Sequence, residues 1–364
     1  MRFPEFTEEW EETTLGKISE ITKGSGISKD QLSEQGSPCI LYGELYTKYK
    51  SEIIDEVYSR TELDSSSLVK SKANDVIIPC SGETAIDIST ARCVPFNNIL
   101  LGGDLNIIRL KHDDGGFFAY QLNGARKKDI ARVAQGVSVV HLYGENLKHI
   151  RVYHPAIEEQ KKITRLLSLI DERIATQNKI IERYESLIRG IAQNVIRSNK
   201  PNVLLSECLE CSSSTLQESD VCENGTYPVY GANGIVGYLD DYNTEDEAVH
   251  IIKDGSGVGT VSYATGRCSA TGTLNTLQAK DGYLLQYLYY MLKVFNFEPY
   301  KTGMAIPHIY FKDYGKAKIF CPSYTEQLKY VELLSAIDNK LSAEQSILTN
   351  LSLQKQYLLR QMFI

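Results

Sequence analysis

The sequence predicts an α+β fold in which two globular modules of mixed α/β structure are separated by two long antiparallel coiled-coil helices, with a pseudo-twofold internal repeat. Three observations lead to this prediction. One residue pattern occurs twice in the 364-residue chain, two segments carry long heptad patterns without proline, and short strand-like runs precede each of them. We expect a module at 1–155, a helix at 156–199, a module at 200–322 and a helix at 323–364.

The repeat runs from Gly136 to Met362 with a fixed offset of 167 residues. The residues of the first copy that recur at this offset are Gly136, His141, Pro155, Glu159, Gln160, Leu166, Leu167, Ser168, Ile170 and Asp171. Solenoid proteins repeat about every 20–50 residues and stack several units, so a longer pattern present only twice indicates two equivalent halves. The copies agree poorly within the modules, which indicates a shared frame with different surface loops.

The first module reads as short strands followed by helix. Its strand-like runs are PCILYGELY, NDVIIPCSGETAID and LNIIRL. The segment GFFAYQLNGARKKDIARV has helical periodicity and ends just before Gly136. It carries a cluster of cations, in which residues three and four apart share one helix face: Arg126, Lys127, Lys128 and Arg132.

The first long helix follows Pro155 and has apolar residues at alternating spacings of four and three. This is the pattern of a coiled-coil seam over more than four heptads. The seam consists of Ile163, Leu167, Ile170, Ile174, Ile181, Ile188, Ile191 and Val195, with Gln177 and Tyr184 completing the register. An unpaired helix would leave this stripe in water, so we expect a partner helix.

The second module repeats the alternation of strand-like runs, in YPVYGANGIVGYLDDY, EAVHIIKDGSGVGTVSYA and ATGTLNTLQA. The segment GYLLQYLYYMLKVF is helical and lies before Gly303. The glycine-rich stretch from Gly255 to Gly259 lacks the Lys-Ser/Thr pair of a phosphate loop and the spacing of a dinucleotide site. We interpret it as a loop that permits close backbone approach.

The second long helix follows Pro322 in the same register. Its seam consists of Tyr330, Leu334, Ile337, Leu341, Leu348, Leu351, Leu358 and Met362, interrupted by Glu344 and Lys355. Because a whole module separates the two helices in sequence, they can pair antiparallel and hold the modules about 50 Å apart at 1.5 Å per residue. The alternative is that both are core helices of one large domain.

Composition limits the possible partners. The chain is 42% hydrophobic and carries a net charge of −7, so any DNA contact must come from local patches. No window approaches 18 uncharged apolar residues, and the acidic start differs from a secretory signal. We therefore expect a cytoplasmic protein that does not contact a membrane.

The sequence favours a binding protein over an enzyme or a metalloprotein. Its eight cysteines read as reduced thiols, and the Cys208–Cys211 pair lacks the second close pair of a zinc site. The chain contains no Asn-Pro-Pro-aromatic, HExxH or GxSxG motif. His141 and His308 recur across the halves without a matched acid and nucleophile, so we interpret them as structural.

The remaining candidates form a recognition surface. Tyrosines lie among Gly, Asn, Ser and Thr, which are side chains that bond to phosphates and base edges, and each half adds cations. Any one of the lysines is typical of solvated surface, but the combination recurs in both halves. The candidate DNA-binding residues are Tyr42, Ser81, Thr84, Arg126, Lys127, Lys128, Arg132, Lys253, Ser256, Arg267, Lys301 and Lys312.

Over its whole length the chain resembles the specificity subunits of type I restriction-modification systems. The resemblance rests on the order of modules and helices, on Pro-x-x-x-Glu-Gln before each helix, and on LGKISEITKG, GVSVVHLYGENLKHIRVYHPAIEEQKKITRLLSLIDERI and GMAIPHIYFKDYGKAKIFCPSYTEQLKYVELLSAIDNKL. It implies that each module reads one half of a split sequence in double-stranded DNA. It also implies that the helices set the gap between half-sites and dock two methyltransferase subunits and, through these, the restriction subunits.

The same resemblance implies that this chain holds no cofactor, and that S-adenosylmethionine, ATP and Mg²⁺ belong to the partner subunits. The alternative reading from the residues is a scaffold whose two modules bind proteins on a coiled-coil spacer. Steep weakening of binding by salt would identify DNA as the ligand, because DNA releases counterions and an apolar protein interface does not. A third interpretation is that the chain is an enzyme. Loss of all activity when a partner methyltransferase is removed would exclude it.

Overall fold

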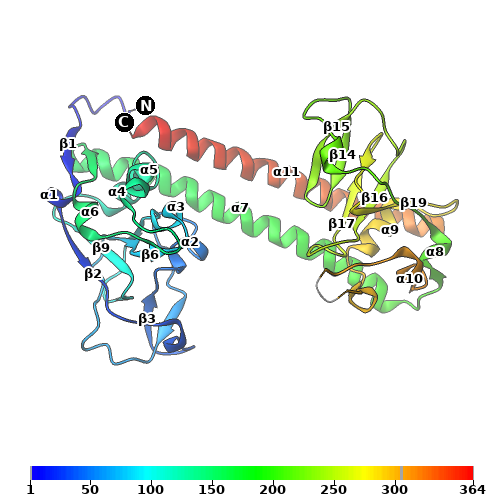
Figure 1. Cartoon of the computed structure of the whole chain (residues 1–364), viewed down its shortest axis with the longest axis horizontal. Coiled ribbons are helices and arrows are strands. Elements are labelled where there is room, and N and C mark those ends of the chain that lie inside the picture. The colour runs from blue at the N-terminus through cyan, green and yellow to red at the C-terminus, as the bar shows by residue number, and fades with distance from the viewer. Residues whose placement is uncertain (1, 304–305, 364) are drawn as a thin grey trace. The chain divides into compact units, whose positions relative to one another are not determined.

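The structure is a computed structural model that describes residues 2–303 and 306–363. The chain forms two compact units, the first from Met1–Asn178 and Ile347–Ile364, the second from Lys179–Ser346. Two long helices, α7 (Ile157–Ser198) and α11 (Tyr324–Met362), each contribute residues to both units (Figure 1). The predicted fold class is confirmed. The predicted limits of the recognition modules stay a prediction, because each compact unit combines a module with parts of both helices.

The first unit contains a four-stranded sheet of order β2-β9-β5-β7 and a three-stranded sheet of order β4-β3-β8. Two further pairs, β1-β11 and β10-β6, are antiparallel. The strands are β1 (Glu11–Thr14), β2 (Ser19–Lys23), β3 (Ser37–Ile40), β4 (Ser59–Thr61), β5 (Asp75–Pro79), β6 (Ser81–Gly82), β7 (Arg92–Val94), β8 (Leu100–Leu101), β9 (Leu105–Leu110), β10 (Val140–His141) and β11 (Arg151–His154). The helices before α7 are α1 (Leu15–Ile18), α2 (Glu44–Thr47), α3 (Ala85–Ile88), α4 (Gly115–Asn123), α5 (Lys127–Val133) and α6 (Gly144–Lys148), with a 3₁₀ turn at Lys29–Gln31.

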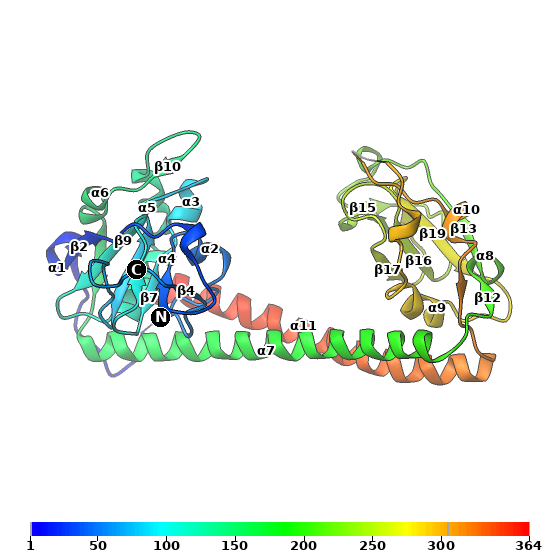
Figure 2. The ribbon, with the colours of Figure 1, turned by 90° about the horizontal axis from the view of Figure 1, so that it is seen from below.

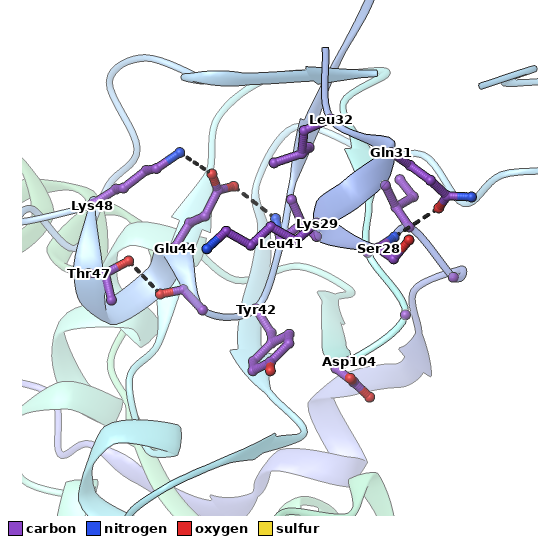
Figure 3. A pocket seen from close by; sticks show the side chains of 15 residues that line it. Ser28, Lys29, Gln31, Leu32, Leu41, Tyr42, Glu44, Thr47, Lys48 and Asp104 are labelled. Atoms are coloured by element: carbon purple, nitrogen blue, oxygen red, sulfur yellow. Dashed lines mark hydrogen bonds and ion pairs between the residues drawn. The ribbon is translucent and has the colours of Figure 1, made fainter. Parts of the chain in front are cut away.

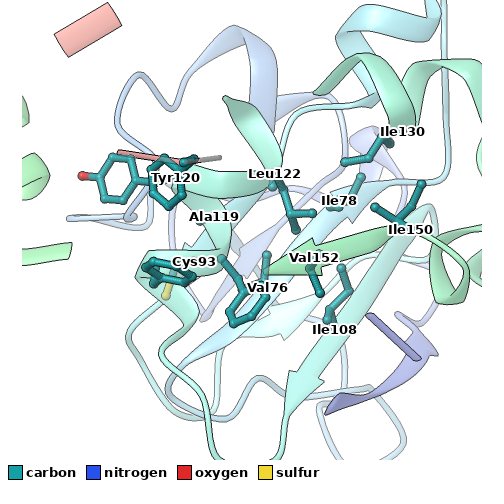
Figure 4. Packing of buried hydrophobic residues seen from close by; sticks show 14 of the residues in the cluster. Val76, Ile78, Cys93, Ile108, Ala119, Tyr120, Leu122, Ile130, Ile150 and Val152 are labelled. Atoms are coloured by element: carbon teal, nitrogen blue, oxygen red, sulfur yellow. The ribbon is translucent and has the colours of Figure 1, made fainter. Parts of the chain in front are cut away.

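Helix α4 lies in the core of the first unit because it is apolar on every side, and a helix of that kind must be buried. Its residues Ala119, Tyr120 and Leu122 pack with Val76 and Ile108 of the sheet (Figure 4). The same cluster includes seam residues from the start of α7 and the end of α11. Helix α4 therefore joins the sheet of the first module to the helix pair.

The second unit repeats this sheet arrangement. Its four-stranded sheet has the order β13-β19-β16-β17 and its three-stranded sheet the order β15-β14-β18. The strands are β12 (Val203–Leu204), β13 (Leu209–Ser212), β14 (Tyr227–Gly231), β15 (Gly234–Leu239), β16 (Ala248–Ile252), β17 (Val261–Ala264), β18 (Ser269–Ala270), β19 (Leu274–Ala279) and β20 (Lys318–Ile319). The helices are α8 (Leu205–Cys208), α9 (Leu285–Leu292) and α10 (Phe311–Tyr314), with 3₁₀ turns at Glu218–Asp220 and Glu298–Tyr300.

The two three-stranded sheets show that the repeat extends into the modules. In each, one strand pairs parallel with a short strand, as Cys39 does with Leu100 and Val229 with Ser269. The connection before the antiparallel neighbour differs, since α2 and a long loop join β3 to β4, whereas a tight turn joins β14 to β15. The frame is thus shared and the connections differ, as the sequence predicts.

One glutamine from each Pro-x-x-x-Glu-Gln motif fixes a module helix to a long helix. Gln160 Oε1 accepts a hydrogen bond from the Asp114 backbone N–H at 2.9 Å, and its Nε2 donates to the Pro155 carbonyl at 2.9 Å. Gln327 accepts from the Leu284 backbone N–H at 2.9 Å and donates to the Pro322 carbonyl at 3.0 Å. These bonds satisfy the backbone at the starts of α4 and α9, and α9 lies beside the long helices in the second unit (Figure 2).

The predicted seam positions turn inward. The buried members are Ile163, Leu167, Ile170, Ile181, Ile188, Val195, Leu334, Leu341, Leu358 and Met362, and the half-buried members are Ile174, Ile191, Tyr330, Ile337, Leu348 and Leu351. In the first unit the start of α7 packs against the end of α11, so the helices run antiparallel there. Within the described ranges, no helix combines the length and apolarity needed to cross a bilayer.

Candidate nucleic-acid interface

The basic cluster of the first module lies on and beside α5, but its members differ in exposure. The Arg132 side chain is 75% exposed and reaches Asp129 at 3.0 Å, and Lys128 is exposed as well. Lys127 is half-buried, with Nζ 3.4 Å from Thr90 Oγ1, and burial together with the nearby Arg92 charge lowers the pKa of Lys127. The Arg126 guanidinium lies over the ring of Tyr153, 5.0 Å from its centroid. Lys128 and Arg132 are therefore the members best placed for phosphate contact.

Ser81 and Thr84 lie near an exposed loop that the sequence did not single out. Ser81 pairs with His141 in the β6-β10 ladder, and Thr84 caps α3 by accepting from the Asp87 N–H at 3.1 Å. The loop from Gln135 to His141 closes on itself, with Gly136 at a φ of +118° and Val137 97% exposed. Val139 of the same loop is 53% exposed, so the loop presents two apolar side chains to solvent.

The second unit builds the same loop from the second copy of the repeat. Thr302 bridges His308 as Gln135 bridges His141, and Gly303 has a φ of +88°. His308 Nδ1 lies 2.6 Å from Asp254 Oδ1, so this histidine has an acidic neighbour in the second unit. The sequence signal that could have revealed both loops is the recurrence of Gly136 as Gly303 and of His141 as His308. We call residues 135–141 and 302–308 the repeated loops; Met304 and Ala305 lie outside the described residues.

Tyr42 lines a cavity of about 910 Å³ in the first unit (Figure 3). Glycines at 26, 102 and 103 form much of its wall, and Lys29 and Asp104 add opposite charges. Glu44 stabilises one side, because its carboxylate accepts from the Leu41 backbone N–H at 2.9 Å, from Lys48 Nζ at 2.6 Å and from the Ser59 hydroxyl. Tyr42 is thus half-buried at the edge of a preformed hollow.

The candidates of the second module lie in two places. Lys253 and Ser256 belong to the glycine-rich loop, which contacts the repeated loop through a hydrogen bond from the Gly255 N–H to the Pro307 carbonyl at 3.0 Å. Nearby in sequence, Lys312 lies over the ring of Tyr310 at 5.2 Å. Arg267 lies elsewhere, 4.9 Å over Tyr242 and 3.3 Å from Glu245. The structure therefore groups Lys253 and Ser256 with the repeated loop and leaves Arg267 apart.

Two further features bear on chemistry. Lys301 Nζ pairs with Glu298 at 2.6 Å, and the Lys301 side chain is 29% exposed. Within residues 2–303 and 306–363 no group of three or more His, Cys, Asp or Glu side chains could hold a metal ion. Burial raises the pKa of Cys208 to about 12 and that of Cys211 to about 11, so both thiols are protonated at neutral pH.

This architecture defines a recognition protein with two modules of one topology on a helical frame. A family model described as the type I restriction modification DNA specificity domain matches residues 7–186 and 205–352. The chain therefore belongs to the family of type I DNA specificity subunits. As a member, it is a non-catalytic component that gives a restriction-modification complex its DNA sequence specificity, and the predicted family is confirmed.

Relatives and solved structures agree with this assignment. The chain is 24% identical over 270 residues to a putative type I specificity subunit of Mycoplasma genitalium, covering 68% of this chain and 70% of the relative. A putative type I specificity subunit of Mycoplasma pneumoniae is 23% identical over 361 residues, covering 91% and 90%.

The crystal structure of a type I S subunit from M. genitalium has the same fold, with a TM-score of 0.69, 19% identity, and coverage of 98% of this chain and 96% of that one. A chain from a structural study of complex assembly and conformational transition in a type I system matches at a TM-score of 0.55, with 15% identity and 97% coverage of each.

Proposed function

We propose that each module reads one half of a bipartite DNA sequence and that α7 and α11 set the spacer between the halves. The observation that carries this proposal is the pairing of a repeated frame with unlike loops. Both modules have the same sheet order and the same glutamine anchor, Gln160 or Gln327. A protein that presents two different loop sets on one frame is suited to reading two different short sequences.

The helices suit the role of a spacer because each is one uninterrupted element. Helix α7 has 42 residues and α11 has 39. At 1.5 Å per residue these lengths correspond to about 60 Å of helix. A rigid element of this kind fixes a distance far better than a flexible linker does.

Within each module we assign phosphate contacts to exposed cations and base contacts to loop side chains. Lys128, Arg132 and Lys312 are exposed and carry the charge that phosphates require. Tyr42, Ser81 and Ser256 lie on loops or at strand ends, where side chains can reach base edges in a groove. Lys127 contributes less than the sequence predicts, because its side chain is half-buried beside Thr90.

The partners in this proposal are two methyltransferase subunits that dock on the long helices, with restriction subunits held through them, in the cytoplasm. Support comes from large apolar side chains that the helices leave exposed, among them Leu169, Leu187, Leu333, Leu353 and Tyr357. Exposed apolar groups along a helix favour a protein partner over solvent. S-adenosylmethionine, ATP and Mg²⁺ would bind those subunits and not this chain.

Module exchange tests the proposal. Residues 200–322 are replaced by the corresponding module of a relative, the complex is assembled with its methyltransferase subunits, and methylated adenines are sequenced in treated genomic DNA. One half of the recognised sequence should change while the other half and the spacer stay the same. Reinsertion of the original module at the same junctions is the control. A change in both halves together would contradict separate reading.

A further inference from the structure

Lys355 interrupts the apolar seam of α11, yet its side chain is only 13% exposed. Its Nζ lies 2.5 Å from Glu52 Oε2 and 2.6 Å from Asp171 Oδ1, and 5.7 Å from the ring centroid of Tyr120. These partners come from the loop after α2, from α7 and from α4. One ammonium group thus joins the first module to both long helices.

The group around Lys355 is a connected network. The Tyr120 hydroxyl donates to Asp171 Oδ2 at 2.7 Å, and the Ser51 hydroxyl donates to the same oxygen at 3.1 Å. The backbone of Glu52 is held in turn, because the Cys93 N–H donates to its carbonyl at 2.8 Å. A buried polar network is rigid when its members are paired, since any displacement leaves a desolvated charge alone.

Lys355 is the cation that pairs with both carboxylates of this network, Glu52 and Asp171. Arg92 adds a nearby positive charge, but its guanidinium donates to the Leu45 and Tyr49 carbonyls. Burial disfavours the charged form of Lys355, but the two carboxylates outweigh it and raise the pKa of Lys355. The lysine is therefore an ammonium group at neutral pH, and its removal would leave the buried carboxylates in excess.

In the second unit an isoleucine stands at the position equivalent to Lys355. Asp338 occupies the place of Asp171 in the repeat, and the Tyr290 hydroxyl lies 3.5 Å from its Oδ2, as Tyr120 does at 2.7 Å in the first unit. The residue 167 positions before Lys355 is Ile188, which is buried. Ile188, Asp338 and Tyr290 line a cavity of about 470 Å³. Arg189 and Lys293 also line this cavity, so the cations near Asp338 are placed differently from the Lys355 that pairs with Asp171.

We propose that Lys355 is the positioning residue that fixes the orientation of the first module on the helix pair, and so keeps the spacer between half-sites to a single length. This inference rests on the proposed function, because it assumes that the module reads DNA from that orientation. A shift of one base pair corresponds to about 3.4 Å along the duplex. Without the buried Lys355 cation, the first module can shift by this distance on the helix pair while the loops that read bases stay unchanged.

The test compares Lys355→Met with Lys355→Arg in the complex assembled with methyltransferase subunits. Genomic DNA without this modification is treated, and sequencing of methylated adenines reports both half-site sequences and the spacer at every site. For Lys355→Met we expect unchanged half-site sequences and about a tenfold larger share of sites whose spacer is one base pair too long or too short. Lys355→Arg can pair with both carboxylates and should keep the parental spacer distribution. Lys340→Met, at an exposed position of α11, is the matched control.

A purely structural role would lower methylation at all sites and leave the spacer distribution unchanged, and that result would overturn the inference. If Lys355→Met fails to assemble, Glu52→Gln replaces it, because this change removes one charge and leaves the Asp171 pair. The Glu52→Gln variant should broaden the spacer to a smaller extent, and an unaltered distribution would overturn the inference equally. Failure of the proposed function itself gives a different result, since the parental complex would then show no bipartite sequence.

Discussion

The two units share their sheet topology and differ in the side chains of their cores. Each has a four-stranded sheet of the same order and a glutamine that anchors a module helix. In the first unit Ile40 and Ile77 pack in an apolar cluster. At the equivalent strand positions the second unit has Tyr230 and His250, whose rings lie 5.1 Å apart. Topology thus survives replacement of apolar core residues by polar ones, provided that strand pairing is kept.

The largest expected difference between the units concerns a lysine placed in the seam of α7, once within each unit. Leu167→Lys buries an ammonium group in the closed core of the first unit, where Leu167 is fully buried, and should destabilise that unit by about 4 kcal/mol or more. Ile188→Lys faces a cavity lined by Asp338 and also by Arg189 and Lys293, so the new cation gains a carboxylate but meets two like charges, and it should cost less than Leu167→Lys.

Hydrogen exchange of α4 and α9 measures these two effects separately, since a single unfolding transition is not expected for a protein with two units. Equal loss of protection in both variants would mean that the cavity beside Asp338 does not accept a cation. Leu167→Met and Ile188→Met keep the volume without the charge and serve as paired controls.

A second difference appears on acidification. Both ring nitrogens of His250 are buried, and no hydrogen-bond partner for them lies among the described residues. Burial lowers the pKa of His250 from 6.5 to about 4. The folded state holds this ring neutral, so its stability is complete above pH 6.5 and falls as the pH drops toward 4. The loss at pH 4 is about 3 kcal/mol for the second unit.

His250→Ile, which installs the residue type of the first unit, should remove this acid sensitivity, and Ile77→His should transfer it to the first unit. Hydrogen exchange between pH 7 and 4, followed for β16 and β5, provides the measurement. Acid sensitivity that persists in His250→Ile would assign the effect to another group.

The smallest expected effects concern DNA affinity. In the first unit, Lys128→Ala with Arg132→Ala should weaken binding to cognate and scrambled duplexes alike and lower the salt slope by about 0.9 for each phosphate that is no longer neutralised. Lys127→Ala should change the slope less, because that side chain is half-buried against Thr90. Titrations of the assembled complex at several salt concentrations compare these variants with Lys312→Ala in the second unit. If the salt slope changed only in the Lys127→Ala variant, the phosphate contact would belong to Lys127 and not to Lys128 and Arg132.

Periodic features were the most predictable from sequence. Heptads identify α7 and α11 because their register depends only on residues three and four apart. The common sheet order was not predictable, since equivalent strands such as β5 and β16 share little sequence and pair with distant segments. The sequence showed Lys355 only as an interruption of the seam, because its partners lie far away in the chain. Glu52, for example, is 303 residues distant. Likewise, Lys127 read as a phosphate contact because helical spacing does not reveal that Thr90 lies beneath it.

The glutamine anchor has a consequence for how new specificities arise. Gln327 binds the backbone groups of Leu284 and Pro322, whereas Gln160 also donates to the Asp113 carboxylate at 2.8 Å, so the second joint depends less on module side chains than the first. Recombination between genes can therefore exchange the segment after α7 without a compensating mutation in the helices. The first module is less exchangeable, because an incoming sequence must also bring an acid where Glu52 stands to meet Lys355. Natural variation among close relatives should accordingly accumulate faster in the second module than in the first.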